Sequence, residues 1–264
     1  MSDFILYNAP QSTCSQRVRF VLHAKNIPFT EHKLDLFSGD QLKPEYLAIN
    51  PNGVVPALIH QGHTILDSSV ITEYLDEVAN DEVCFSPASP EKKALMRWMM
   101  RYVDEIPAPA IRVPSYNLAF LPHFQKMTEE EFTALANSKP LRKEFLLTMG
   151  RTGFPKADMD QALDKLNRAV IRMNEWITQN QGPWIMGDQI SLVDIAIMPV
   201  IVRMEDINLS DAWADKPLIS AWLKNIQAHP VFHKTYYSGS LLTEKYPHLA
   251  YLRNKEKSSI SSST

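Results

Sequence analysis

The sequence predicts an α/β domain over residues 1–80 followed by an all-helical domain over residues 90–250. Three observations support this division. Short apolar runs typical of strands alternate with helical spacings in the first part, whereas the second part has no convincing strand. The stretch 81–89 between them carries proline and small polar residues, which predicts a linker. The length of 264 residues is ample for two hydrophobic cores.

The first domain is predicted to have the order β-α-β-α-β-β-α. The run FILY predicts a buried strand, and the apolar spacing from Val18 to Leu22 predicts the helix after it. NIPFTEHKLDL and PEYLAI predict a strand and a short helix. PALIHQGHTIL predicts two strands joined at Gln61-Gly62. VITEYLDEV, capped by Ser68 or Ser69, predicts the last helix. This order is that of a thioredoxin-like domain.

The second domain is predicted from helix signals alone. Ser89 followed by Pro90 is typical of a helix start, and repeated prolines in PAPAIRVPSYNLAFLPHF predict an interrupted helix. TEEEFTALAN and PLRKEFLLTMG predict short helices. Ser191 and Asp194 have the spacing of a capping box before a buried helix. A further apolar stripe predicts core packing, through Met159, Leu163, Leu166, Val170, Met173 and Ile177.

Composition excludes several classes of partner. The net charge is −3 without a basic run, which argues against nucleic acid. No window is long and apolar enough for a bilayer, and no membrane partner is expected. Two cysteines favour a reducing compartment, the cytoplasm. The scattered histidines and cysteines suggest no metal site. The polar tail over 251–264 is predicted to be disordered.

The start of the first predicted helix carries three hydroxyl side chains and one thiol. The stretch QSTCSQRVRF places Ser12, Thr13, Cys14 and Ser15 where helix N–H groups are free. Such side chains can cap the helix, and they can also activate a sulfur nucleophile or act as one. Ser12 and Ser15 stand where a Cys-x-x-Cys pair would lie, which argues against a dithiol reductase.

Four segments in order resemble one family. They are STCSQRVRFVLHAKNIPF, INPNGVVPAL, ILDSSVITEYL and PWIMGDQISLVDIAI. Together they resemble the cytosolic glutathione S-transferases, over most of the chain except roughly 105–157. The resemblance implies the glutathione transferase fold, glutathione as co-substrate and a two-fold homodimer.

The resemblance also implies residues that hold glutathione. Val55 would expose its backbone to the peptide through a cis bond to Pro56, the alternative being an ordinary turn proline. Asp67 and Ser68 would hold the γ-glutamyl end, or serve only as a helix cap. Gln41 and Lys43 are candidates for the glycine carboxylate, although loop residues of this kind are usually only solvated. The lysine often found before the Val-Pro pair is Val54 here.

Two residues are candidates for catalysis. Ser12 falls where zeta-like members carry the catalytic serine, and would stabilise the glutathione thiolate. Cys14 falls where zeta isomerases and reductive dehalogenases carry a cysteine; the alternative is a half-buried core residue. A cysteine at Ser12 would have suggested an omega-like thiol transferase. The second substrate is expected between the first domain and the helical segment that carries Trp98, Tyr102, Arg112 and Tyr116.

The expected activity is attack of glutathione thiolate on a hydrophobic, aromatic electrophile, by conjugation, ether cleavage or dehalogenation. The segment after Trp184 looks closer to dehalogenases and β-etherase-like members, and Gln16 replaces the tryptophan of the zeta motif. Two alternatives stay open. One is a cis-trans isomerase of the maleylacetoacetate type. The other is a non-catalytic module that binds glutathione or another ligand.

Overall fold

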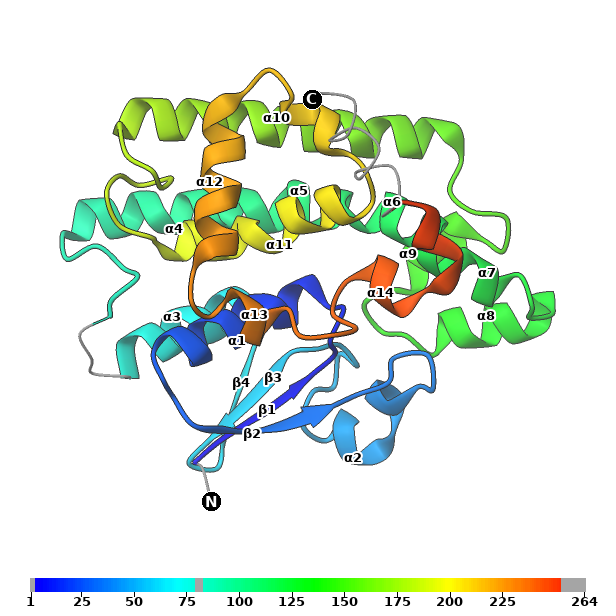
Figure 1. Ribbon diagram of the computed structural model, residues 1–264. Coiled ribbons are helices and arrows are strands. Elements are labelled where there is room, and N and C mark those ends of the chain that lie inside the picture. Colours follow the sequence, from blue (N-terminus) through cyan, green and yellow to red (C-terminus); the bar gives the residue numbers. More distant parts are fainter. Residues whose placement is uncertain (1–2, 79–82, 253–264) are drawn as a thin grey trace.

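The computed structural model describes residues 3–78 and 83–252, which form a sheet domain and a helical domain (Figure 1). The first domain has four strands and three α-helices in the described residues: β1 Phe4–Asn8, α1 Thr13–Ala24, β2 Phe29–Lys33, α2 Pro44–Leu47, β3 Ala57–His60, β4 His63–Leu66 and α3 Ser68–Val78. The predicted thioredoxin-like order is confirmed, with one short 3₁₀ turn added at Asp40–Leu42.

The sheet has the strand order β2-β1-β3-β4. β1 pairs with β2 in parallel, and β1–β3 and β3–β4 are antiparallel, as predicted. The β3–β4 hairpin turns at Gln61 and Gly62, whose φ angles of 50° and 79° suit a two-residue turn of this kind. The helices α1 and α3 lie between the sheet and the helical domain in Figure 1. Their apolar faces form one core with Leu6 and Leu58 of the sheet.

The second domain is helical in its described part, apart from one isolated bridge between Trp184 and Gly187. Its α-helices are α4 Pro90–Glu105, α5 Pro107–Ala110, α6 Arg112–Ser115, α7 Leu121–Phe124, α8 Glu129–Asn137, α9 Lys143–Met149, α10 Lys156–Asn180, α11 Leu192–Asp206, α12 Pro217–Ala228, α13 Phe232–Thr235 and α14 Leu242–Lys245. The predicted interruption after α4 is confirmed, because short helices and a π turn at Tyr116–Phe120 replace one long helix.

The predicted capping box at the start of α11 is confirmed. Asp194 is fully buried, and its carboxylate accepts from the backbone N–H of Ser191 at 2.8 Å and from Trp222 Nε1 at 2.8 Å. It also accepts from the N–H of Ile185 at 2.9 Å. Burial raises the pKa of this carboxyl group. One side chain thus joins the start of α11, the loop before it and α12.

The domain boundaries at residues 80 and 90 are not tested by the structure and stay a prediction. α3 ends at Val78 and α4 begins at Pro90, but residues 79–82 of the predicted linker lie outside the described part of the chain. Of the tail 251–264, residues 253–264 also lie outside it.

A buried arginine fixes the turn that leads into α1. Arg19 donates Nη2 to the carbonyl of Pro10 at 2.9 Å and Nη1 to Asn8 Oδ1 at 2.6 Å. Its Nε and Nη2 both donate to the carbonyl of Thr235, at 3.1 and 3.0 Å. The turn between β1 and α1 is therefore held from both domains, and this turn carries the candidate site.

Candidate active site

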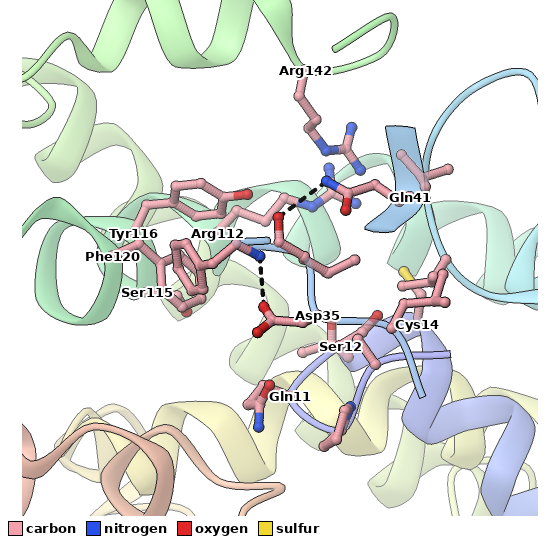
Figure 2. Close-up of a pocket in the computed structure, with 18 of the residues that line it drawn as sticks. Gln11, Ser12, Cys14, Asp35, Gln41, Arg112, Ser115, Tyr116, Phe120 and Arg142 are labelled. Atoms are coloured by element: carbon pink, nitrogen blue, oxygen red, sulfur yellow. Dashed lines mark hydrogen bonds between the residues drawn. The ribbon is translucent and has the colours of Figure 1, made fainter. Parts of the chain in front are cut away.

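A cavity of about 390 Å³ opens between the two domains (Figure 2). The first domain contributes the turn from Ala9 to Cys14, the segment after β2 and the loop at Gly53–Val55. The helical domain contributes side chains from the segment 111–146, together with Arg203, Lys245 and Tyr246. In Figure 2, Ser12 and Cys14 lie on the side opposite Tyr116 and Phe120.

Ser12 caps α1 and faces this cavity. Its Oγ accepts from the N–H of Ser15 at 3.2 Å, and its own N–H donates to the carbonyl of Ala9 at 3.1 Å. The cap uses the hydroxyl oxygen as acceptor, so the O–H hydrogen can still donate into the cavity. Ser15 is different, because it is fully buried and its Oγ accepts from the N–H of Ala9 at 3.4 Å. Capping and activation are thus compatible in Ser12.

Cys14 also lines the cavity as a half-buried, free thiol. It lies in the first turn of α1, where backbone N–H groups and the helix dipole favour a thiolate. Its position therefore fits a reactive group, while leaving the structural alternative open. The other free cysteine, Cys84, is exposed and does not line the cavity.

The loop that leads to β3 holds Val55 against the cavity. The Val55-Pro56 bond is cis, which confirms that prediction. The preceding carbonyl, that of Val54, accepts from Tyr46 Oη at 2.6 Å and from Asn50 Nδ2 at 2.7 Å. Val55 lines the cavity and Pro56 does not. Tyr46 and Asn50 therefore fix the loop before the cis bond at the cavity wall.

Gln41 reaches the cavity and Lys43 does not. Gln41 is buried, and its Nε2 donates to the carbonyl of Leu36 at 3.2 Å. Its Oε1 is buried without a hydrogen-bond partner among the described residues, which is unusual for such an atom. Lys43 is exposed and pairs with Asp40 at 2.7 Å. Of the two candidates for the glycine carboxylate, only Gln41 is therefore placed at the cavity.

Asp67 and Ser68 lie outside the cavity lining. Asp67, not Ser68 or Ser69, caps α3, because its Oδ1 accepts from the N–H groups of Ser69 and Val70 at 2.9 and 3.2 Å. Ser68 is buried and its Oγ accepts from Arg17 Nη1 at 3.3 Å. Both residues stand at the start of α3.

The structure brings two of the four predicted electrophile residues to the cavity. Arg112 and Tyr116 line it, beside Phe37, Phe120 and Phe124. Trp98 and Tyr102 do not. The Trp98 side chain is 54% exposed on α4. Tyr102 packs edge-on against Trp176 of α10, with ring centroids 5.6 Å apart.

Sequence reasoning missed several lining residues, above all Lys139 and Arg142. They lie in the short connection between α8 and α9, within the segment 105–157 that resembles the family least. Their charge was visible in the sequence. Their position follows from a second apolar cluster, in which Phe132 of α8 and Leu146 of α9 pack on Phe124. No local pattern predicts that packing.

The described residues contain no group of three or more His, Cys, Asp or Glu side chains that could hold a metal ion. None of the described helices is long and apolar enough to cross a membrane.

The fold and the cavity define the class of the protein: a thioredoxin-like domain with a cis-proline loop, joined to a helical domain across a shared cavity. Two family descriptions match the chain: glutathione S-transferase N-terminal domain over residues 11–78, and C-terminal domain over residues 124–230. The chain belongs to the glutathione S-transferase family.

Individual relatives agree with this assignment. Protein LigF of a Sphingobium species is 29% identical over 238 residues, 88% of this chain and 92% of the relative. Glutathione S-transferase 1 of Dianthus caryophyllus is 30% identical over 198 residues, 75% of each chain. Maleylacetoacetate isomerase maiA of Aspergillus fumigatus is 40% identical over 103 residues, 36% of this chain and 45% of the relative. The crystal structure of β-etherase LigF from Sphingobium has a TM-score of 0.79 at 27% identity, covering 88% of this chain and 98% of that chain.

Proposed function

We propose that this glutathione S-transferase attacks an aromatic electrophile with glutathione thiolate, in a transfer or lyase reaction. The observation that supports it most is the shape of the cavity. Ser12 and Cys14 stand at a helix N-terminus on one wall, and Tyr116 and Phe120 lie on the facing wall. Phe124 also lines the cavity and stacks on Tyr116, with ring centroids 6.4 Å apart. A thiol held at the first wall meets an aromatic ring held at the second.

Glutathione lies along the first domain in this proposal. The backbone of Val55 pairs with the peptide backbone of glutathione, by short strand addition. The buried, unpartnered Oε1 of Gln41 accepts a hydrogen bond from a bound ligand, which accounts for an atom otherwise left unpaired. Asp67 and Ser68, at the start of α3, receive the γ-glutamyl end, with Ser68 held by Arg17.

Ser12 activates the thiol in this proposal. A free thiol has a pKa of about 8.5, so only about 3% is ionised at pH 7. The Ser12 hydroxyl donates to the sulfur, and the N-terminus of α1 adds favourable charge. A decrease of about two pKa units, about 2.7 kcal/mol, makes the thiolate the major species. Ser12 stabilises the anion and does not take the proton itself.

The bond changes are the same for an aryl ether and an aryl halide. The sulfur forms a C–S bond to the electrophilic carbon, and the C–O or C–halogen bond breaks. Its electron pair leaves with phenolate or halide, and the thiol proton passes to solvent. The β-etherase relative supports an ether substrate, since it is similar over 88% of this chain.

A second candidate is cis-trans isomerisation by transient addition of glutathione, in which no glutathione is consumed. The similarity to maleylacetoacetate isomerase maiA over 103 residues favours it. A third candidate, a binding module without catalysis, uses the same cavity.

A substrate screen separates these candidates. The protein is first tested for retention on immobilised glutathione, and failure at millimolar glutathione would contradict all three. Turnover of β-aryl ethers or halonitroarenes with loss of free thiol supports the proposal. Turnover of maleylacetoacetate without thiol loss supports the isomerase. Binding without turnover of any of them supports the module and contradicts the proposal.

We further infer a homodimer in the cytoplasm. Val70 of α3 and Leu95 and Trp98 of α4 are 55%, 41% and 54% exposed. The two helices are neighbours, joined by an ion pair between Arg97 and Glu73 at 2.7 Å, so these apolar side chains support an interface there. Two free cysteines agree with a reducing compartment. A monomeric mass by light scattering at micromolar concentration would contradict the dimer.

A further inference from the structure

The cavity is strongly positive in a protein whose net charge is −3. Six cationic side chains line it: Lys33, Arg112, Lys139, Arg142, Arg203 and Lys245. The single lining carboxylate is that of Asp35. Asp35 Oδ1 already accepts from the N–H groups of Phe37 and Ser38 at 2.9 and 3.2 Å, which ties it to its own loop. The lining therefore has unmatched positive charge.

The excess is concentrated in Arg112, Lys139 and Arg142, which we call the cation cluster. All three are half-buried, and within the described residues none of them forms an ion pair. Arg203 differs, because it lies 3.8 Å from Asp206. The exposed Arg101 and Arg168 each pair with an acidic residue, at 2.8 Å in both cases. These two exposed arginines thus have partners that the cluster lacks.

Burying these charges without an acidic partner is unfavourable. Burial lowers the pKa of the Lys139 ammonium. Burial also lowers the pKa of the Arg142 guanidinium, and the positive charge of Arg112 adds to this effect. A bound anion would reverse both effects, because it supplies the missing opposite charge. Binding of an anion is therefore favoured at the cluster.

The surroundings of the cluster indicate what carries the anion. Arg112 opens α6, and Lys139 and Arg142 lie in the α8–α9 connection, all on the helical side of the cavity. Tyr116, Phe120 and Phe124 provide aromatic surface on that same side. A guanidinium binds carboxylate through two parallel hydrogen bonds, and an aromatic ring packs on the apolar wall. An aromatic acid satisfies both features in one molecule.

We propose that the second substrate is an aromatic electrophile bearing a carboxylate, and that the cation cluster binds this carboxylate. The inference rests on the proposed function and narrows its substrate class. Figure 2 shows Arg142 and Arg112 directed toward Gln41, so the carboxylate lies between the aromatic wall and the glutathione side. The carboxylate is not changed in the reaction; it holds the ring while the sulfur attacks.

A matched pair of electrophiles tests the proposal. 4-Chloro-3,5-dinitrobenzoate and its methyl ester react with glutathione by the same step, formation of a C–S bond and loss of chloride. After division by the uncatalysed rates, kcat/KM is expected to be at least about ten-fold higher for the acid. Arg142→Gln and Lys139→Gln are each expected to lower kcat/KM for the acid about ten-fold, and that for the ester less than two-fold.

Lys143→Gln is the control. Lys143 is exposed at the start of α9, so this substitution removes one positive charge outside the cavity lining. It is expected to leave the preference for the acid intact. If the Arg142→Gln and Lys139→Gln variants lose kcat/KM equally for the acid and the ester, the proposal is overturned, because equal losses indicate a structural role. A rise in KM for glutathione alone would also overturn it, because the cluster would then bind the glycine carboxylate. Glutathione esterified at glycine would identify that case.

A binding measurement separates failure of this inference from failure of the proposed function. 3,5-Dinitrobenzoate has no leaving group, and it is titrated by calorimetry into protein saturated with S-methylglutathione. Binding that weakens about ten-fold in Arg142→Gln, but not in Lys143→Gln, supports the carboxylate site even if no electrophile is turned over. Absence of binding to the unmodified protein, or equal affinity in all three proteins, overturns it.

Discussion

Arg203 of α11 donates Nη2 to the backbone carbonyl of Gln11, 2.7 Å away, and so connects the helical domain to the turn that precedes Ser12. Its Nη1 lies 3.5 Å from Ser115 Oγ, and its Nε lies 3.8 Å from Asp206 Oδ2. Arg203 is buried, so these contacts have no competition from bulk water. One guanidinium thus fixes the activating turn relative to the aromatic wall.

Replacing this arginine is expected to affect both stability and binding. Arg203→Leu removes a buried charged donor and is expected to lower the free energy of unfolding by about 3 kcal/mol. Because the Gln11 turn then loses its anchor, KM for glutathione is expected to rise. Urea unfolding and steady-state kinetics measure the two effects. Arg168→Leu is the control, since Arg168 is exposed on α10 and pairs only with Asp164 within the described chain. Lower stability with an unchanged KM would show that the contact does not position the turn.

Ser12 is predicted to have two separable effects. Ser12→Ala removes the cap of α1 and is expected to lower the free energy of unfolding by about 1 kcal/mol. It also removes the hydroxyl that donates to sulfur, so the pKa of bound glutathione is expected to rise and turnover at neutral pH to fall. Much of the activity is expected to return at higher pH, where the thiol ionises unaided. The pH dependence of kcat/KM and the ultraviolet absorbance of the bound thiolate measure this effect.

Ser89→Ala is the matched control for Ser12. Ser89 caps α4 by accepting from the N–H of Lys92 at 3.4 Å, and it does not line the cavity. This variant is expected to lose stability without a change in the pH profile. If Ser12→Ala behaves in the same way, Ser12 only caps the helix.

Cys14 has its own test, based on products. In this test the Cys14 thiolate attacks the sulfur of the bound glutathione conjugate: the S–S bond of a mixed disulfide forms, the C–S bond breaks, and its electron pair stays on the carbon, which takes a proton from solvent. If this step occurs, Cys14→Ser is expected to stop before it and release the glutathione conjugate. Mass spectrometry of the products detects this conjugate, and it also detects glutathione bound to the unmodified enzyme. An unaltered product profile would show that Cys14 has no chemical role. Cys84→Ser is the control, because Cys84 is exposed and outside the cavity lining.

The parts of the fold that could be predicted are those with local causes. The hairpin follows from Gln61-Gly62, the start of α11 from the Ser191–Asp194 spacing, and the interruption after α4 from prolines. Each signal acts over a few residues. The cis bond before Pro56 was predictable only from resemblance to a family, because a single sequence does not distinguish a cis-proline from an ordinary turn proline.

The acceptor side of the cavity has no such local signal. Periodicity shows that one face of α4 is buried, but it does not tell which exposed face borders a cavity. Trp98 and Tyr102 were therefore predicted as substrate residues, although they lie outside the cavity lining. Lys139 and Arg142 reach the cavity only because distant aromatic residues pack α8 and α9 beside it. That packing depends on contacts between residues remote in the sequence. The charged residues of the sequence therefore do not by themselves predict a cation cluster at the cavity.

A last prediction concerns stability in acid. His229 lies between α12 and α13, and its Nδ1 accepts from the N–H of Val231 at 3.4 Å, which requires a nitrogen without a proton. Burial lowers the pKa of His229 below its usual 6.5. Burial also lowers the pKa of His23, and the positive charges of Lys234 and Arg19 act in the same direction. The folded protein therefore binds protons at these rings less readily than the unfolded chain does.

The direction of the pH effect follows from this difference. Below about pH 6.5 the unfolded state takes up more protons, so the free energy of unfolding falls as pH decreases toward the lowered folded pKa values. Urea unfolding at pH 7.5 and 5.5 is expected to show lower stability at pH 5.5. His229→Asn keeps an acceptor near Nδ1 and removes the titrating ring, so the fall is expected to be smaller. His63→Asn, at an exposed position on β4, controls for the loss of any histidine. An equal fall in the His229→Asn variant and the unmodified protein would show that this ring does not set the acid limit of the fold.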